Sequence, residues 1–322
     1  MDQLRIAVIA GGLSLEREVS LHSGTRIAEA LESHGHKVTV LDVDEHLIDH
    51  LEQASPDLAY LALHGRVGED GTVQGLLELM GIPFTGPDAR ASSLAWDKGV
   101  VKGVWRRQGI PTPDWISMTS DAIRDLGAAR VLPRIVERLK LPLVVKPTQG
   151  GASMGVGFVN QPGELTDALI GSFRYHPVAL IERFIAGTEV AISIVGGQAL
   201  PVVEIEVPGS GAGGKHYDFS ARYTPGAATL HAPARLPPDV LANATEVAMT
   251  AYTLSAARHV TRVDLIVDHE GAPWLLELDT CPGMTETSLL PAAAEAAGHS
   301  FADICEQIVA AALANLGGDP TT

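Results

Sequence analysis

The sequence predicts an α/β fold of more than one domain, with a parallel sheet in its N-terminal part. In the first ninety residues, short apolar strands alternate with helical stretches, a pattern typical of a parallel sheet. In the last third, two apolar runs flank Gly196-Gly197, which predicts a β-hairpin. The chain has 322 residues, enough for two or three domains with hydrophobic cores.

The N-terminal part is expected to bind a ligand at one edge of its sheet. Its predicted elements are strands over 4–9, 37–42 and 59–63, with a helix that ends near residue 33. Ligands of parallel sheets bind beyond the carboxyl ends of the strands, so the loops 11–20 and 64–71 are candidate binding loops. The first loop lacks Gly-x-Gly-x-x-Gly, which disfavours a dinucleotide-dependent dehydrogenase.

The middle of the chain contains a glycine-rich run between predicted strands. A helix over 97–108 and strands over 141–147 and 178–184 surround this run, which covers residues 148–157 and holds four glycines. It lacks the Lys-Ser/Thr ending of a P-loop, but its glycines would let backbone N–H groups approach phosphates. A flexible hairpin turn is the alternative interpretation.

The last third includes an acidic hairpin over residues 262–279, with a tight turn expected at 269–271. We expect Asp264 opposite Leu275 and Arg262 opposite Glu277. The alternation of side chains then places apolar residues on one face, namely Val263, Leu265, Val267, Trp274, Leu276 and Leu278. Arg262, Asp264, Glu277 and Asp279 share the other face, where a cation such as Mg²⁺ would relieve the repulsion of the carboxylates. The alternative is a solvated hairpin with ordinary surface charge.

Composition excludes several classes of protein. The net charge of −16 disfavours non-specific binding of nucleic acid, which needs clustered Lys and Arg. Two cysteines offer neither a disulfide framework nor zinc-ligand spacing. The N-terminus does not resemble a signal peptide, and no apolar run approaches the roughly 18 residues of a membrane span. We therefore expect a soluble, cytoplasmic protein without a membrane partner, and a helix over 301–316 to end it.

The order of the motifs resembles that of D-alanine–D-alanine ligases of the ATP-grasp superfamily. The matching segments are 11–20, 63–75, 97–98, 145–147, Glu182, 217–225, 262–264 and 277–289. Each motif is short, but together they span nearly the whole chain. The resemblance implies three domains, over residues 1–95, 96–186 and 187–322, with ATP held between the second and the third.

The resemblance also implies the residues that contact ATP and a metal ion. Lys98 and Lys146 would touch the phosphates, and the loop 149–157 would close over them. The other implied ATP contacts are Gly151, Ser153, Glu182, Arg183, Glu189 and Arg222, with Glu189 on the ribose. The implied metal ligands are Asp264, Glu277 and Asp279, for Mg²⁺ or alternatively Mn²⁺.

For the amino acids, the resemblance implies two subsites and a two-step reaction through an acylphosphate. Glu16 would orient the ammonium of the first D-alanine near His64, and Ser288 would bind the carboxylate of the second. Arg262 and the backbone N–H of Gly283 would stabilise the oxyanion. The implied set also includes Tyr223 as a catalytic residue and Arg222 as a substrate contact, in a homodimer that makes peptidoglycan precursors.

Four positions depart from the family pattern. Ala152 replaces a serine that links the equivalents of Glu16 and Tyr223; arginines replace lysines at 183 and 222; and Asp279 replaces an asparagine. These changes leave open a divergent ligase that joins other amino acids. A non-catalytic nucleotide-binding paralogue is a further alternative, which the intact charged residues of the site disfavour. D-lactate as second substrate is disfavoured, because Tyr223 matches the dipeptide-forming pattern.

Overall fold

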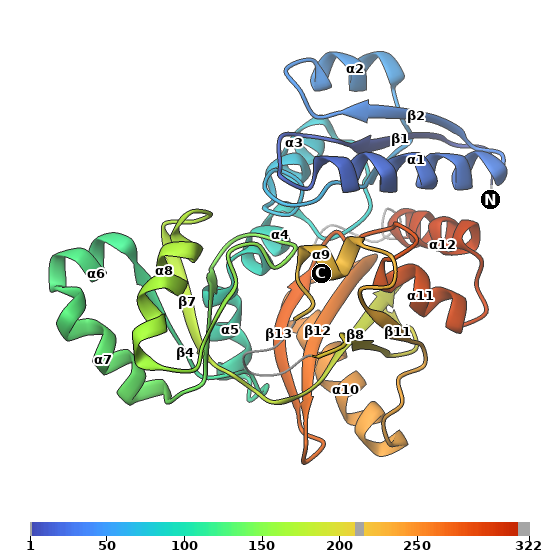
Figure 1. Cartoon of the computed structure of the whole chain (residues 1–322). Helices are drawn as coiled ribbons and strands as arrows, with labels where there is room; N and C mark the ends of the chain where they lie inside the picture. The colour runs from blue at the N-terminus through green and yellow to red at the C-terminus, as the bar shows by residue number, and fades with distance from the viewer. Residues whose placement is uncertain (1, 210–215, 315–322) are drawn as a thin grey trace.

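The computed structural model describes residues 2–209 and 216–314, which form three β-sheets with helices packed on them (Figure 1). In the first sheet, β1 (Arg5–Ala10) lies between β2 (Lys37–Asp42) and β3 (Leu58–Leu61) and is parallel to both. The predicted parallel sheet is therefore confirmed.

Helices cover both faces of this sheet because its strands alternate apolar side chains between them. On one face, Ile6 and Val8 pack with α1 (Arg17–Ser33) and α12 (Phe301–Ala314). On the other, Ala7 and Ile9 pack with α2 (Leu47–Ala54) and α3 (Thr72–Met80). The last described helix thus completes the core of the first sheet. Residues 315 and 316 of the predicted terminal helix lie outside the described residues.

The second sheet is antiparallel, in the order β4-β7-β5-β6. Its strands are β4 (Trp115–Thr119), β5 (Leu143–Pro147), β6 (Gly157–Val159) and β7 (Val178–Arg183). Its helical segments are α6 (Ser120–Leu126), α7 (Ala128–Leu139), η1 (Pro162–Glu164) and α8 (Leu165–Phe173). The core between them is formed by residues such as Leu143, Ile181 and Leu165. The sheet carries β5 and β7, which were predicted, and β4 and β6, which were not.

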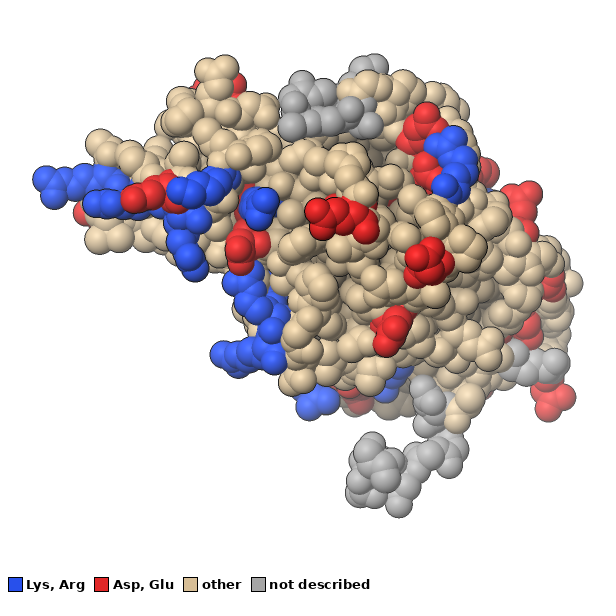
Figure 2. Space-filling model, turned by 90° about the horizontal axis from the view of Figure 1, so that it is seen from below, with Lys and Arg blue, Asp and Glu red and all other residues tan. Residues whose placement is uncertain are grey.

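Positive charge gathers at the end of the molecule where α7 lies. Ile135 and Leu139 of α7 are buried, whereas Arg130, Arg134 and Arg138 are exposed, because they fall on opposite sides of an amphipathic helix. Figure 2 shows Lys and Arg concentrated at this end of one face, while the rest of that face is mostly uncharged. The negative net charge is therefore unevenly distributed.

The third sheet runs in the order β11-β10-β8-β12-β13, with β9 paired to β8. Its strands are β8 (Gly187–Val195), β9 (Gln198–Ala199), β10 (Val203–Glu206), β11 (Thr229–His231), β12 (Val260–Asp268) and β13 (Pro273–Asp279). Its helices are α9 (Phe219–Tyr223), α10 (Pro238–Leu254) and α11 (Leu289–Ala296), while α4 (Ala89–Trp96) and α5 (Lys98–Arg107) link it to the other sheets. The hairpin at Gly196-Gly197 is confirmed. Its second strand is divided between β9 and β10 on either side of Pro201, which has no N–H to donate.

The acidic hairpin forms, but the predicted register is wrong. Asp264 pairs with Glu277, and Arg262 pairs with Asp279. A β-bulge after Asp264 then shifts the register, so that Leu265 pairs with Leu275. Leu275 is consequently fully buried in the core. Trp274 and Leu276 belong to the opposite face, against the prediction that they share the apolar one.

The domain boundaries after residues 95 and 186 stay a prediction. The three sheets follow one another along the chain in the predicted order, but α4 runs across the first boundary. Among the described helices, none has both the length and the apolar character needed to cross a bilayer.

Candidate active site

Two adjoining cavities lie where the three sheets meet. A small cavity has a volume of about 70 Å³ and a large cavity about 280 Å³. Every residue predicted for the site lines one or both of them. The small cavity is lined by Glu16, His64, Tyr223, Arg262, Asp279, Gly283 and Ser288. The large one is lined by Lys146, Ser153, Glu182, Arg183, Glu189 and Asp264. Lys98, Gly151, Arg222 and Glu277 line both.

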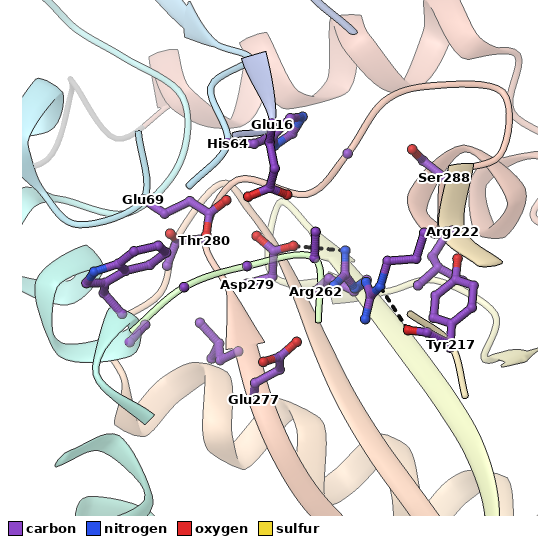
Figure 3. A pocket seen from close by; sticks show the side chains of 18 of the residues that line it. Glu16, His64, Glu69, Tyr217, Arg222, Arg262, Glu277, Asp279, Thr280 and Ser288 are labelled. Carbon is purple, nitrogen blue, oxygen red and sulfur yellow. Dashed lines mark hydrogen bonds and ion pairs between the residues drawn. The ribbon is translucent and has the colours of Figure 1, made fainter. Parts of the chain in front are cut away.

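Carboxylates converge at one end of the small cavity. Figure 3 shows the side chains of Glu16, Glu69 and Asp279 pointing into the same space. Burial, together with the charge of Asp279, raises the pKa of Glu16 to about 7. Its Oε2 atom is buried and has no hydrogen-bond partner within the described part of the chain. This end of the cavity is therefore suited to receive a cation that donates hydrogen bonds.

Glu69 is a residue of the cavity that the sequence analysis missed. Its carboxylate accepts a hydrogen bond of 2.8 Å from the backbone N–H of Gly65. Burial, and then the charges of Asp279 and Glu16, raise its pKa well above the ordinary value. The signal that could have found Glu69 is its place in the loop beyond β3, which was predicted to bind a ligand.

His64 lies beside these carboxylates and is held by two contacts. Its Nδ1 atom lies 3.2 Å from the carbonyl oxygen of Cys281, and its Nε2 atom lies 3.5 Å from Oγ of Ser23. Burial lowers its pKa. The imidazole is therefore neutral near pH 7, where it can donate and accept hydrogen bonds but adds no charge.

The loop after β13 forms the other end of the small cavity (Figure 3). Oγ of Ser288 accepts a hydrogen bond of 3.0 Å from the backbone N–H of Thr285 and lies 2.8 Å from its hydroxyl. A Cβ atom at Gly283 would approach Oγ of Ser288 to 2.8 Å, so a larger residue there would displace this hydroxyl. The loop therefore presents a hydroxyl and a bare backbone to the cavity.

Arg262 lines the small cavity and binds two of the predicted metal ligands. Its Nε and Nη2 atoms donate to the two carboxylate oxygens of Asp264 at 2.7 and 2.8 Å. Its Nη1 atom lies 2.9 Å from Oδ2 of Asp279. Oε2 of Glu277 lies 3.4 Å from the ammonium of Lys98. Burial alone would raise the pKa of Glu277, but the charges of Lys98 and Lys146 lower it to about 2.

The carboxylates of Asp264, Glu277 and Asp279 are suitable donors for Mg²⁺, but their oxygen atoms do not lie close enough together in this structure to bind one ion. Residues 2–209 and 216–314 contain one group of three potential metal-ligand atoms that lie within 4.8 Å of one another. This group belongs to Glu204, Glu206 and His231. There, Arg235 already pairs with both glutamates. A metal at the predicted place would therefore have to draw Asp264, Glu277 and Asp279 away from Arg262 and Lys98.

The large cavity combines charged and apolar walls. Glu182 lies between two lysines, with Oε1 2.5 Å from Nζ of Lys146 and Oε2 2.9 Å from Nζ of Lys102. Burial raises the pKa of Glu189 to about 7. The apolar wall includes Ile266, Leu276 and the rings of Phe158 and His216, which are stacked. This wall offers a flat apolar surface beside a cluster of cations.

The glycine-rich loop is tied to α9 without the serine that the family pattern carries. Ala152 and Ser153 both have positive φ values, of 47° and 56°. Oγ of Ser153 donates a hydrogen bond of 3.0 Å to the carbonyl oxygen of Tyr217 and accepts one of 3.3 Å from Nη2 of Arg222. Ser153 thus forms a link between the two segments although Ala152 has no hydroxyl.

Three sheets around an acidic small cavity and a lysine-rich large cavity place this protein in the ATP-grasp class, whose solved structures it matches along almost its whole length. Residues 104–310 match the family described as D-ala D-ala ligase C-terminus, and residues 45–87 match D-ala D-ala ligase N-terminus. The chain therefore belongs to the D-alanine–D-alanine ligase family.

Individual relatives and solved structures support this assignment to the family. The D-alanine–D-alanine ligase of Moorella thermoacetica is 41% identical over 96% of this chain and 99% of its own length. That of Pelotomaculum thermopropionicum is 40% identical over 98% of each chain. The structure of the Bacillus anthracis D-alanine–D-alanine ligase complexed with ATP superposes with a TM-score of 0.82, at 33% identity, over 97% of this chain and 98% of that one. A D-Ala:D-Ser ligase from Enterococcus faecalis superposes with a TM-score of 0.81 at 26% identity, over 97% of this chain and 100% of that one.

Proposed function

We propose that this protein uses ATP to join two D-alanine molecules into D-alanyl-D-alanine, a precursor of peptidoglycan. The observation that carries this proposal is the buried Oε2 of Glu16, which no described residue hydrogen-bonds, at the end of the small cavity opposite Ser288. The two ends suit the ammonium of one amino acid and the carboxylate of another. Membership in the D-alanine–D-alanine ligase family supports the choice of D-alanine.

In this proposal the large cavity holds ATP. Its stacked rings and aliphatic side chains receive the adenine, and Glu189 accepts hydrogen bonds from the ribose. Lys98 and Lys146 contact the phosphates, as compact cations that suit phosphate oxygens. The backbone of Gly151 and Ser153 covers them, and Arg183 and Arg222 add positive charge to the wall of the cavity.

Asp264, Glu277 and Asp279 would hold Mg²⁺ or Mn²⁺, which would neutralise charge on the phosphates during transfer. The donor set fits, since all three are carboxylates on one face of the β12–β13 hairpin. Arg262 and Lys98 neutralise these carboxylates when the metal is absent.

The reaction then follows from the order of the groups along the two cavities. A carboxylate oxygen of the first D-alanine attacks the γ-phosphorus of ATP, the bond to the β-phosphate breaks, and an acylphosphate and ADP result. The neutral amine of the second D-alanine attacks the acyl carbon and gives a tetrahedral intermediate. Phosphate leaves as the amide forms and accepts the proton that the nitrogen loses, while Arg262 and the N–H of Gly283 stabilise the oxyanion. Burial raises the pKa of Tyr223, so its hydroxyl stays protonated as a donor at the substrate.

A panel of D- and L-amino acids tests the proposal, with release of ADP and phosphate measured and dipeptides identified by mass spectrometry. D-Alanyl-D-alanine formed with one ADP per dipeptide is the expected result. A different dipeptide with no D-alanyl-D-alanine would replace it with the divergent ligase, which the changes at Ala152, Arg183, Arg222 and Asp279 favour. Binding of ATP without any dipeptide would favour the non-catalytic paralogue.

The oligomeric state, the cellular location and the domain boundaries are further parts of the proposal. We infer a homodimer in the cytoplasm, with three domains over residues 1–95, 96–186 and 187–322. Sedimentation equilibrium of the purified chain tests the dimer, and limited proteolysis near the two boundaries tests the domains. A monomer at all concentrations would refute the first inference.

A further inference from the structure

Lys102 is a buried cation that takes no part in the proposed reaction. It lies on α5 four residues after Lys98, so both side chains project from the same face of the helix. Lys98 lines both cavities, whereas the side chain of Lys102 is 0% exposed. A buried ammonium is costly unless a partner compensates its charge. The partner of Lys102 is Glu182, whose Oε2 lies 2.9 Å from its Nζ.

Glu182 has two ammonium partners for one negative charge. Nζ of Lys146 lies 2.5 Å from Oε1 of Glu182, on the opposite side of the carboxylate from Lys102. Of the two lysines, it is Lys146 that lines the large cavity. A ligand in that cavity can therefore reach Lys146, while Lys102 stays with Glu182.

The local charges agree with this division. Burial lowers the pKa of Lys102 to about 8, which the charge of Glu182 partly opposes. Burial alone would raise the pKa of Glu182, but the two lysines together lower it. The indole ring of Trp115 lies 5.5 Å from Nζ of Lys102 and adds a weak attraction for the cation. The carboxylate therefore stays ionised with Lys102 beside it.

We propose that Lys102 is a positioning residue for ATP: as the permanent counter-ion of Glu182, it frees Lys146 to contact a phosphate. Without Lys102, Lys146 could turn to a phosphate only by leaving a buried carboxylate uncompensated. Lys146 would then be shared between Glu182 and ATP, and its contact with the phosphate would weaken. This inference rests on the proposed binding of ATP in the large cavity.

Binding of ATP and of adenosine to Lys102→Met, measured by calorimetry, tests the inference. Methionine keeps the length of the side chain and removes its charge. We expect the affinity for ATP to fall about tenfold, the effect of weakening one hydrogen bond to a charged group. The affinity for adenosine should not change, because adenosine offers no phosphate to Lys146. Equal losses for both ligands, or no loss for ATP, would overturn the inference. Failure of the wild-type protein to bind ATP would instead refute the proposed function.

Removal of Glu182 provides the second half of the test. In the Glu182→Gln background there is no carboxylate to hold Lys146, so Lys102→Met should change ATP affinity by less than about twofold. This comparison also serves if Lys102→Met alone fails to fold, since the double variant buries no unpaired carboxylate. A tenfold loss in that background would show that Lys102 acts independently of Glu182 and overturn the inference.

Steady-state kinetics separate positioning from a general effect on the fold. Lys102→Met should raise the KM for ATP and leave the KM for D-alanine and kcat near the wild-type values. Lys37→Met, at an exposed position of β2, is the matched control and should change none of them. A uniform loss of kcat with an unchanged KM for ATP would contradict a positioning role.

Discussion

The small and large cavities differ in how their buried carboxyl groups are ionised and paired. In the small cavity, Glu16 and Glu69 lie together with raised pKa values, and Oε2 of Glu16 lacks a hydrogen-bond partner among the described residues. In the large cavity, Glu182 is ionised between Lys102 and Lys146. The first site thus favours the uncharged form of its carboxyl groups until a cationic substrate arrives to stabilise the carboxylate. In the large cavity, the two lysines pair with a protein carboxylate until an anionic substrate binds one of them.

This difference explains why the cavities can lie so close together. Glu277 and Arg222 line both, and Glu277 is compensated by Lys98. An ammonium and a triphosphate would each meet charge of the opposite sign, with a neutralised boundary between them. Five substitutions test the comparison.

Glu277→Gln should have the largest effect, because Glu277 belongs to both cavities. We expect kcat to fall by about 100- to 1000-fold, as when a group that stabilises transition-state charge is removed. Asp279→Asn keeps an oxygen ligand and should retain substantial activity. Rates of ADP formation at saturating ATP and D-alanine provide the measurement. Equal and complete loss in both variants would show that Asp279 has a role the family pattern does not imply.

Glu16→Gln should change the small cavity alone. It removes the partner of the ammonium and should raise the KM for the first D-alanine by about 10- to 100-fold, the range for a hydrogen bond to a charged group. The pH dependence gives a sharper result. Because the pKa of Glu16 is about 7, the wild-type carboxylate becomes ionised as pH rises from about 6 to about 8, and D-alanine should bind more tightly.

The same pKa predicts a change in stability with pH. The folded protein holds a proton on Glu16 up to about pH 7, while the unfolded chain releases it near the ordinary glutamate pKa of 4.5. The empty protein should therefore lose stability as pH rises between these values, and Glu16→Gln should lessen that loss. Thermal unfolding across this range is the control, and identical slopes in both proteins would contradict the assignment of the pKa.

Ser153→Ala should have a smaller effect, on the large cavity. It removes the hydrogen bonds that link the glycine-rich loop to Tyr217 and Arg222. A typical net hydrogen bond contributes about 0.5–1.5 kcal/mol, so the KM for ATP should rise about two- to tenfold. Faster proteolysis in the glycine-rich loop of the empty variant would accompany this. A wild-type KM would show that the link does not support closure over ATP.

Ala152→Ser should have the smallest effect. Ser153 already links the glycine-rich loop to Tyr217 and Arg222, so restoring the serine of the family pattern should change the KM for the first D-alanine by no more than about twofold. A larger decrease would mean that the Ser153 link does not substitute for the family one. Loss of activity with the fold intact would mean that the loop was aligned wrongly with the family.

The sequence predicted elements well where local pattern decides them. The strand over 37–42 was predicted with the bounds that β2 has, because a short apolar alternation lies between turn residues. The hairpin at residues 262–279 was found, but not its bulge, since one extra residue leaves the apolar–polar pattern almost unchanged. The predicted pairing of Asp264 with Leu275 therefore failed, while the charged face was kept.

Glu69 and Lys102 were not predicted, because tertiary packing rather than local sequence brings them into the site. Glu69 resembles an ordinary polar loop residue until the fold brings it beside Glu16 and Asp279. Lys102 resembles a surface lysine of an amphipathic helix until Glu182 of β7 is placed against it. In both cases the functional environment comes from another part of the chain. The order of the motifs was enough to predict the residues of the site. The pKa values of these residues depend on neighbouring side chains that the sequence alone does not reveal.

The position of α12 has a consequence for synthesis of the chain. One face of the first sheet is completed by Ile304 and Ile308 of α12, about three hundred residues after β1. A ribosome releases the strands first and this helix last, so the apolar face that α12 covers stays open while the other two sheets are made. The N-terminal part therefore cannot finish its own core before α12 has been made. A nascent chain halted before residue 300 would present that face to chaperones.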